Sequence, residues 1–424
     1  MSRRKTALAL VGGAVAAALA LSGCASSKLE SNSGATTLTF WTRANSADFD
    51  KKIVAAYNAS HDTKVTLTVV PNDLFVTKFG SAAGSGQAPD LAAVDVIYMP
   101  NFNKAHQFQD LTSKIDALPF KNDLVKAHLK LSTVDGKTYA VPHNVDASAL
   151  FYNKSLFKAA GLDPEKPPTT WAEIHDDAAK ISALGNDTYG YYFGGACAGC
   201  QAYGGFPMIW ASGGSVLNED GTKATLDSPA VRDYLTWNHQ MLAQKLVPPS
   251  AATENGSTWQ SSFLTGKVGM VGLGTFAIAG MKAQTAFDWG IAPLPGKNGG
   301  GTASFVGGDT IGIPAGSKHS AEAWDFIKWS LSDDAQINVV SKNGALTART
   351  DLADNKYTKE DPRLLVNNKM LETGQTPYSL AYNALINDAN GPWNLTLRKG
   401  IVEGDVDAAV TQGQEAMTKI LNAG

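Results

Sequence analysis

The chain has little cysteine, no excess of basic charge and no long apolar run beyond its first residues. Three of its 424 residues are cysteine, and 36 Lys and Arg stand against 39 Asp and Glu, for a formal net charge of −3. A domain that binds nucleic acid carries clustered Lys and Arg, and this balance indicates none. A transmembrane helix needs about 20 consecutive apolar residues, and no such run follows residue 24. The sequence therefore predicts neither a nucleic-acid partner nor a membrane-spanning segment after that point.

The short motifs of several enzyme classes are missing as well. The sequence contains no G-x-x-x-x-G-K-[ST], no H-E-x-x-H and no G-x-S-x-G, and its seven histidines show no paired spacing. "VGLGTFA" places Gly272, Gly274 and Ala277 at the G-x-G-x-x-A spacing, but a lone match is weak evidence for a dinucleotide site. A tight turn that brings Phe276 to a cleft explains it better. Spacing alone leaves a glycosidase-like acidic pair open, yet we expect no catalysis, cofactor or metal.

The N-terminus is built like an export signal. A charged start (Arg3–Lys5) precedes an apolar run (Ala7–Leu21) that is too short to span a bilayer but has the length of a signal-peptide core. The run ends in "LSGC", which resembles the lipobox of bacterial lipoproteins. We therefore expect a signal peptide over 1–23, lipidation of Cys24, a flexible tether over 24–35 and an extracytoplasmic protein held to the cell membrane by lipid alone. A plain secretory signal with an incidental cysteine is the alternative.

The other two cysteines form a C-x-x-C pair, Cys197 and Cys200, in "FGGACAGCQAYGG". In an exported protein the simplest interpretation of such a pair is a small disulfide loop. A thioredoxin-like redox site stays open, although the flanking glycines fit it poorly. A metal site would need two further ligands, and no histidine lies nearby.

The length of the chain and its hydrophobic pattern predict an α/β protein of two lobes. Strands are expected over 36–42, 64–70 and 89–94, with an amphipathic helix over 47–60 between the first two. This alternation is typical of a largely parallel sheet. Further helices are expected from Thr170 through Leu184, opened by a capping box with Glu173, and over 228–242 and 320–331.

A resemblance to a known family rests on segments that follow one another along almost the whole mature chain. They are "LTFWTRANSADFDKKIVAAYN", "GSGQAPDLAAVDVIYMPNFNKAHQFQDLT", "DGKTYAVPHNVDASALFYNKSLFKAAGLDPEKPPTTWAEI", "FLTGKVGMVGLGTFAIAGM" and "WGIAPLPG" with "SFVGGDTIGIPAGSKHSAEAWDFIKWSL". Each segment alone is weak evidence for a family, but five segments in this order and spacing are strong evidence. Together they resemble the extracellular solute-binding proteins of ABC transporters, in the branch that carries sugars and oligosaccharides.

The resemblance implies a periplasmic-binding-protein-like fold, in which two α/β lobes close by a hinge around a ligand in the cleft between them. The chain would cross between lobes at 139–154, near Phe305–Gly308 and near Asn343–Leu346. The implied lobe boundaries are 36–143 plus 309–343 for lobe 1, and 144–308 plus 344–424 for lobe 2.

The resemblance also implies where the ligand binds. Hydroxyl groups both donate and accept, so Asp, Asn and Arg suit a sugar, and aromatic rings suit its apolar face. Asp146 has an alternative role in capping a helix or turning the chain, and Phe276 stands where the family often has a stacking Trp. Four further aromatic residues fit a core as well as a site: Trp210, Trp259, Tyr382 and Trp393. The loop 194–205 is expected to shape the pocket wall. The expected ligand-binding residues are Trp41, Arg43, Asn45, Asp95, Tyr98, Asn144, Asp146, Phe276, Gly308, Asp309 and Tyr382.

The implied function is that of a monomeric receptor that delivers a sugar to the permease subunits of an ABC importer without breaking any bond. The same fold could serve a polyol, a glycerol phosphate or a peptide. A phosphate would require clustered Arg or Lys in the cleft loops, where only Arg43 stands out. An exported hydrolase is the alternative from a different class.

Overall fold

The computed structural model describes residues 36–284 and 286–423. Its largest sheet has the strand order β2-β1-β3-β12-β6-β8-β7, and β9 pairs with β6. Two short two-stranded pairs, β4 with β5 and β10 with β11, lie outside it. The strands are β1 (Thr37–Arg43), β2 (Lys64–Val70), β3 (Leu91–Asp95), β4 (Thr133–Val134), β5 (Lys137–Thr138), β6 (Ala140–Asn153), β7 (Tyr189–Tyr192), β8 (Val268–Gly274), β9 (Trp289–Ala292), β10 (Leu294–Pro295), β11 (Thr302–Ala303) and β12 (Val306–Gly312).

Helices cover both sides of this sheet, as expected for an α/β protein. The α-helices are α1 (Ala47–Ser60), α2 (Asn72–Gly84), α3 (Met99–Lys104), α4 (Thr112–Asp116), α5 (Lys126–Ser132), α6 (Lys154–Ala159), α7 (Trp171–Ser182), α8 (Ala198–Gly204), α9 (Phe206–Ala211), α10 (Pro229–Ala243), α11 (Trp259–Leu264), α12 (Ala277–Gln284), α13 (Ser320–Ser330), α14 (Lys356–Glu360), α15 (Pro362–Thr373), α16 (Pro392–Leu397) and α17 (Val406–Ala423). Across the described ranges, none has the length and apolarity needed to cross a membrane.

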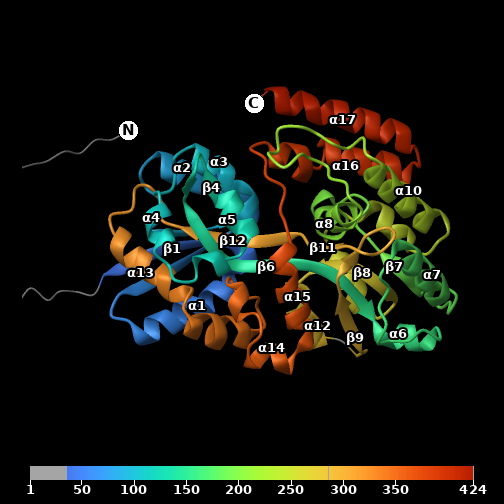
Figure 1. Ribbon diagram of the computed structural model, residues 1–424, viewed down its shortest axis with the longest axis horizontal. Coiled ribbons are helices and arrows are strands. Elements are labelled where there is room, and N and C mark those ends of the chain that lie inside the picture. Colours follow the sequence, from blue (N-terminus) through green and yellow to red (C-terminus); the bar gives the residue numbers. More distant parts are fainter. Residues whose placement is uncertain (1–35, 285, 424) are drawn as a thin grey trace, which may run out of the picture. The chain divides into compact units, whose positions relative to one another are not determined.

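The strands β6 and β12 cross the middle of the sheet (Figure 1). The first half of β6 pairs with β12 and its second half with β8 and β9, while β12 also pairs with β3. They thus join lobe 1, the side with β1, β2 and β3, to lobe 2, the side with β7, β8 and β9. The expected crossings at 139–154 and 305–308 fall on β6 and the start of β12, and Leu346 bridges to Val145. The exact lobe boundaries stay a prediction.

Periodicity predicts the early elements well and the start of α7 in part. The pattern over 36–94 is confirmed as β1, α1, β2 and β3, with α2 added between the last two. At α7 the hydroxyl of Thr170 accepts a hydrogen bond from the backbone N–H of Glu173 at 3.1 Å, as predicted. The return bond was predicted wrongly: the carboxylate of Glu173 accepts from the backbone N–H of Thr169 at 2.6 Å and from its hydroxyl, instead of from the backbone N–H of Thr170.

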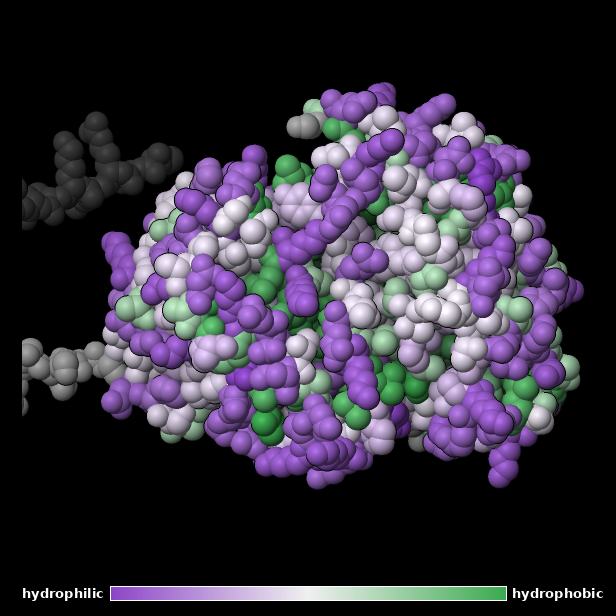
Figure 2. Space-filling view, viewed as in Figure 1, coloured by the Kyte–Doolittle hydropathy of each residue, from purple (hydrophilic) through white to green (hydrophobic). Residues whose placement is uncertain are grey.

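The surface in Figure 2 is mostly hydrophilic, with hydrophobic residues in small groups between polar ones. In the described part of the chain, the exposed large hydrophobic side chains are Val69, Leu74, Phe276, Leu380 and Leu395. Isolated exposed apolar side chains are ordinary on a soluble domain. Phe276 differs from the others because it lies in the cavity described below, where an exposed ring has a use.

A substitution at Gly308 tests the packing of the crossing strands. Gly308 has a φ of 99°, and a Cβ there would overlap the carbonyl oxygen of Asn144 on β6. We expect Gly308→Ala to lower the free energy of unfolding by about 3 kcal/mol or more, since strain and overlap add. Gly86 is the matched control, because it has a φ of 71° and no heavy atom within 4 Å of the position that a Cβ would take; Gly86→Ala should cost about 1 kcal/mol. Equal urea midpoints for the two variants would contradict this packing.

Candidate ligand-binding cleft

A cavity of about 810 Å³ lies where the crossing strands meet both lobes. Its volume is within the range of small-molecule sites, about 300–1,000 Å³. The described residues that line it with polar or aromatic side chains are Arg43, Asn45, Ser46, Phe49, Lys52, Asp95, Asn144, Asp146, Tyr203, Trp259, Gln260, Thr275, Phe276, Phe305, Asn343, Tyr382 and Asn387. Cys197, Cys200, Gly256 and Gly308 add to its wall.

The lobe 1 side of the cavity is a connected polar network around Arg43. The guanidinium donates through Nε to Asp309 Oδ1 at 2.8 Å, and its two terminal nitrogens lie 2.6 Å from Asp309 and 2.9 Å from Asp95. Asp309 is fully buried, and it also accepts a bond from Ser46, whose hydroxyl accepts from Asn144 Nδ2 at 3.1 Å. Each nitrogen of the guanidinium fork is therefore directed at a carboxylate of the protein.

Burial and neighbouring charges shift the pKa values of this network in opposite directions. Burial alone would lower the pKa of the Arg43 guanidinium, but Asp309 and Asp95 raise it above its ordinary value. The pKa of Asp95 is raised, because desolvation outweighs the attraction of Arg43 and Asp309 adds repulsion. Two carboxylates share one guanidinium, so the charge of Arg43 is already matched within the protein.

Strand ends place this network. Arg43 is the last residue of β1 and Asp95 the last residue of β3, and the two parallel strands pair directly, so both side chains leave the same edge of the sheet. Asp309 enters from β12, where it pairs in register with both Asp95 and Asn144. Side chains distant in sequence thus meet at the carboxyl ends of parallel strands, the usual position of ligand sites in open α/β sheets.

Three polar residues of β6, His143, Asn144 and Asp146, each bond to another part of the protein. His143 Nε2 lies 2.6 Å from Asp50 Oδ1 in the interior of lobe 1. Asp146 lines the cavity, and its Oδ1 accepts from the backbone N–H of Phe276 at 3.2 Å, directly before α12. Burial raises the pKa of Asp146 to about 6, although hydrogen bonds from Tyr203, Phe276 and Thr275 oppose the rise. Asp146 therefore lines the cavity and also accepts a bond from the chain just before α12, so both alternatives, a ligand contact and a helix cap, stay open.

An aromatic wall forms the lobe 2 side of the cavity. The Tyr203 ring lies 5.8 Å from that of Phe276 and 6.2 Å from that of Trp259, both edge to face, and the rings of Trp259 and Phe276 lie 5.8 Å apart. Phe305, just before β12, packs on Tyr203 with the ring centroids 4.7 Å apart. Phe276 is 47% exposed and Trp259 is half-buried, so apolar ring surface faces the cavity.

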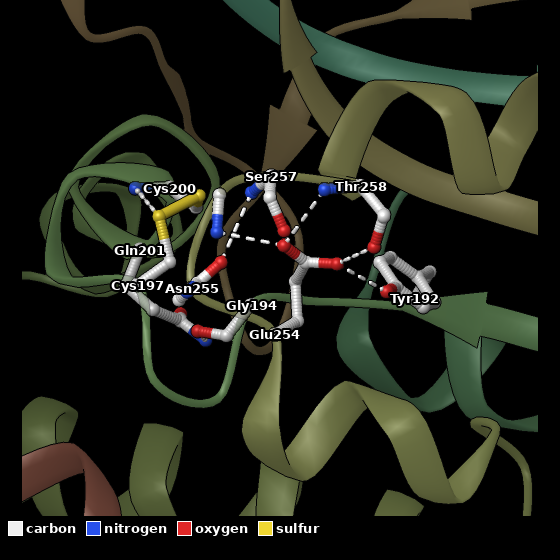
Figure 3. Close-up of a disulfide and its surroundings, with 10 residues drawn as sticks. Tyr192, Gly194, Cys197, Cys200, Gln201, Glu254, Asn255, Ser257 and Thr258 are labelled. Atoms are coloured by element: carbon white, nitrogen blue, oxygen red, sulfur yellow. Dashed lines mark hydrogen bonds between the residues drawn. A yellow bond between two sulfur atoms is a disulfide. The ribbon is translucent and has the colours of Figure 1, made fainter.

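The loop that carries the two cysteines lines the same cavity as this wall, and Figure 3 shows the surroundings of the cysteine pair. The Sγ atoms of Cys197 and Cys200 are 1.94 Å apart, within bonding distance. Figure 3 shows Glu254 next to them, with its carboxylate accepting hydrogen bonds from Tyr192, Thr258 and the backbone that follows. The loop 194–205 forms part of the pocket wall, as the sequence predicts; the oxidation state of the pair stays a prediction.

Most, but not all, of the residues expected at the ligand lie on the cavity surface. The eight expected residues on that surface are Arg43, Asn45, Asp95, Asn144, Asp146, Phe276, Gly308 and Tyr382. Three others point elsewhere: the Trp41 ring stacks under the Lys78 ammonium at 4.8 Å, the Tyr98 hydroxyl donates to Asn383 at 3.3 Å, and Asp309 is held beneath Arg43. Cys24 lies outside the described residues. Contact with a ligand stays a prediction for all eleven expected ligand-binding residues.

Sequence reasoning left Trp259 open between core and site and did not single out Tyr203. Trp393 is fully buried, and Trp210 stacks on Phe305, whereas Trp259 lines the cavity. A signal for Trp259 exists in the sequence, because the turn-forming stretch "ENGST" precedes it and ends a loop before a short helix. Tyr203 lies inside the loop that was expected at the wall, but no pattern singled out its ring.

The arrangement suits the binding of a polyhydroxylated molecule. Across the described residues, no group of three or more His, Cys, Asp or Glu side chains is placed to hold a metal ion. Carboxylates, amides and hydroxyls on one side can exchange hydrogen bonds with a polyhydroxylated molecule, and the rings opposite can cover its apolar face. Two lobes joined by crossing strands also allow closure around a guest.

Comparisons with known proteins identify the family. The Bacillus subtilis arabinooligosaccharide-binding protein is 26% identical, covering 81% of this chain and 80% of that protein. The Yersinia pestis sn-glycerol-3-phosphate-binding periplasmic protein UgpB is 25% identical, covering 60% of this chain and 56% of that protein. The crystal structure of a cyclic alpha-maltosyl-1,6-maltose binding protein from Arthrobacter globiformis, at 25% identity, superposes with a TM-score of 0.80 over 92% of this chain and 100% of that chain. The family model of bacterial extracellular solute-binding proteins matches residues 43–337, well over half of the chain, and the protein belongs to that family.

Proposed function

We propose that the protein captures an uncharged sugar or oligosaccharide in the cleft between its lobes and delivers it to the permease subunits of an ABC importer. The observation that carries the proposal is the opposition of a carboxylate and amide network on lobe 1 to the ring wall of Tyr203, Trp259 and Phe276 on lobe 2. A pyranose offers hydroxyls to the first and a C–H face to the second.

The charge of the cleft favours a neutral ligand over a phosphorylated one. Among the described residues that line the cavity, the charged side chains are Arg43, Lys52, Asp95 and Asp146. Arg43 is already paired with Asp95 and Asp309, and Lys52 is exposed on α1. A phosphate group would meet Asp95, Asp146 and a guanidinium fork already occupied by carboxylates, with the exposed Lys52 as the remaining cation of the described lining. Glycerol phosphate is therefore the weaker candidate, although one relative is named for it.

The rest of the proposal concerns location and assembly. The signal over 1–23 and lipidation of Cys24 would place a monomer outside the cytoplasm, attached to the cell membrane, where it meets its permease. The tether over 24–35 would leave the lobes free to close. An oxidised Cys197–Cys200 pair fits this location, because disulfides persist outside the reducing cytoplasm.

Thermal unfolding of the protein that starts after Cys24 tests the proposed ligand class. A true ligand present at about 100 times its dissociation constant should stabilise the folded state by roughly 2.7 kcal/mol. We expect a higher melting temperature with one neutral di- or trisaccharide and no shift with its epimer or with glycerol 3-phosphate. A shift with glycerol 3-phosphate alone would replace the sugar proposal with the phosphate alternative. Turnover of a chromogenic glycoside would contradict the binding role itself.

A further inference from the structure

Trp259 enters the cleft from a turn that has its own supports. It is the first residue of α11, which spans six residues, Trp259–Leu264. A helix this short has little stability of its own, so its position depends on the contacts that fix its start. The start is the turn 254–258, which lies beside the Cys197–Cys200 pair in Figure 3. The supports of this turn therefore decide where the indole ring stands.

Glu254 holds the turn from inside. Its carboxylate is 5% exposed and accepts hydrogen bonds from the backbone N–H of Gly256 at 2.7 Å, the backbone N–H of Thr258 at 3.1 Å and the Tyr192 hydroxyl at 2.8 Å. The Thr258 hydroxyl donates to it as well. Burial would raise the pKa of Glu254, but the bonds from Thr258 and Tyr192 lower it below its ordinary value. The turn is thus built around an ionised acceptor, and the next residue is Trp259.

The cysteine loop supports the same turn from outside. Backbone bonds join the two segments: Gly195 N–H donates to the Ala251 carbonyl at 2.7 Å, and Ala196 N–H donates to the Glu254 carbonyl at 2.9 Å. Gly256 has a φ of 104°, and a Cβ there would stand 3.2 Å from the Cys197 Sγ. The turn therefore lies directly on the sulfur pair, and only a glycine fits at the contact without strain.

From these contacts we propose that the joined Cys197–Cys200 pair and Glu254 are positioning residues for Trp259, whose ring is a ligand contact of the cleft. The inference rests on the proposed sugar-binding function. With the pair joined and the turn fixed, the ring is held in place before the ligand arrives. With the pair opened, the loop and turn gain conformations, and binding must order them again at a cost in affinity. Affinity for the sugar is thereby coupled to the state of the two cysteines.

The ligand contact is tested by calorimetric titration of the protein after Cys24 with maltotriose, arabinotriose and mannotriose, using the tightest of the three. We expect Trp259→Ala to weaken binding about tenfold or more, since stacked rings add to buried area, and Trp259→Phe to recover part of the loss. Trp324 is the matched control: it is half-buried on α13, where the Lys114 ammonium stands 5.6 Å from its ring. Trp324→Ala should leave the affinity unchanged, and the ligand-induced change in tryptophan fluorescence should vanish only in Trp259→Ala.

The positioning role is tested by opening the pair. Dithiothreitol supplies two electrons and two protons to the sulfurs and closes into its own disulfide, and it should weaken wild-type binding roughly threefold to tenfold. The Cys197→Ser/Cys200→Ser double variant should start at the weaker affinity and not respond to the reagent, and Glu254→Gln should weaken binding in both conditions. Wild-type affinity that is unchanged by reduction, or Trp259→Ala binding that equals wild type, overturns this inference alone. Wild-type protein that binds none of the three sugars or their neutral analogues overturns the proposed function instead.

Discussion

Replacing Arg43 with Ala is expected to cost about 3–5 kcal/mol of unfolding free energy at pH 7, the range for removing one partner of a buried charge pair. Asp309 is fully buried and Asp95 is 21% exposed, and both bond to the Arg43 guanidinium. Without it, two carboxylates face each other in the interior with Ser46 as the remaining donor to Asp309. The loss should shrink as the pH falls, because protonation of Asp95, whose pKa burial raises, removes part of the uncompensated charge.

A second arginine provides the comparison. Arg232 also contacts two carboxylates, Asp227 at 2.9 Å and Asp407 at 2.5 Å, but its side chain is 32% exposed. Arg232→Ala should cost less than about 1 kcal/mol, because exposed ion pairs contribute little. Urea unfolding gives both values, and adding Asp309→Asn to Arg43→Ala should restore part of the loss. If Arg43→Ala unfolds at the same urea concentration as Arg232→Ala, the network does not depend on its guanidinium.

The part of the site on lobe 1 could be predicted from sequence because it follows from local rules. β1 is visible as an alternating apolar run and β3 as a short continuous one, and the polar residues that end parallel strands must share one edge of the sheet. Arg43 and Asp95 obey this rule and lie 2.9 Å apart. Trp41 shares the strand face of Arg43 but is two residues back, about 7 Å along the strand. That offset moves its ring out of the cavity and onto Lys78.

The lobe 2 wall could not be predicted in the same way, because its rings meet through long-range packing. Tyr203 comes from α8, Trp259 from α11 and Phe276 from the turn before α12. Their approach depends on the pairing of β8 with β6 and β7, and on glycines that let backbones come close. A Cβ on Gly272, for example, would stand 2.8 Å from the Cα of Gly204 on α8. No sequence period encodes such a contact.

Asp146 is expected to oppose stability at neutral pH. Its pKa is raised from 3.8 to about 6, so the folded protein holds the proton more tightly than the unfolded chain. The contribution to stability is complete below about pH 4 and is lost as the pH rises through 6, where the buried group must ionise. At pH 7 the ionised carboxylate costs on the order of 3 kcal/mol relative to a solvated one. Asp146→Asn should therefore stabilise the ligand-free protein by roughly 1–3 kcal/mol at neutral pH and by little below pH 4.

Sugar binding should respond in the opposite sense. A carboxylate that accepts a bond from a ligand hydroxyl contributes about 1.5–3 kcal/mol, so Asp146→Asn should weaken binding roughly tenfold to a hundredfold at pH 7. Wild-type affinity should fall as the pH drops through 6, because both oxygens of Asp146 are free to accept hydrogen bonds only in the ionised carboxylate. The affinity of the Asp146→Asn variant should not change with pH. Asp220, exposed on a lobe 2 loop, provides the control, since Asp220→Asn should change neither quantity. Calorimetric titration from pH 5 to 8 measures the affinity for the sugar, and urea unfolding measures the stability. A variant that is more stable yet binds as tightly as wild type would show that Asp146 serves α12 and not the ligand.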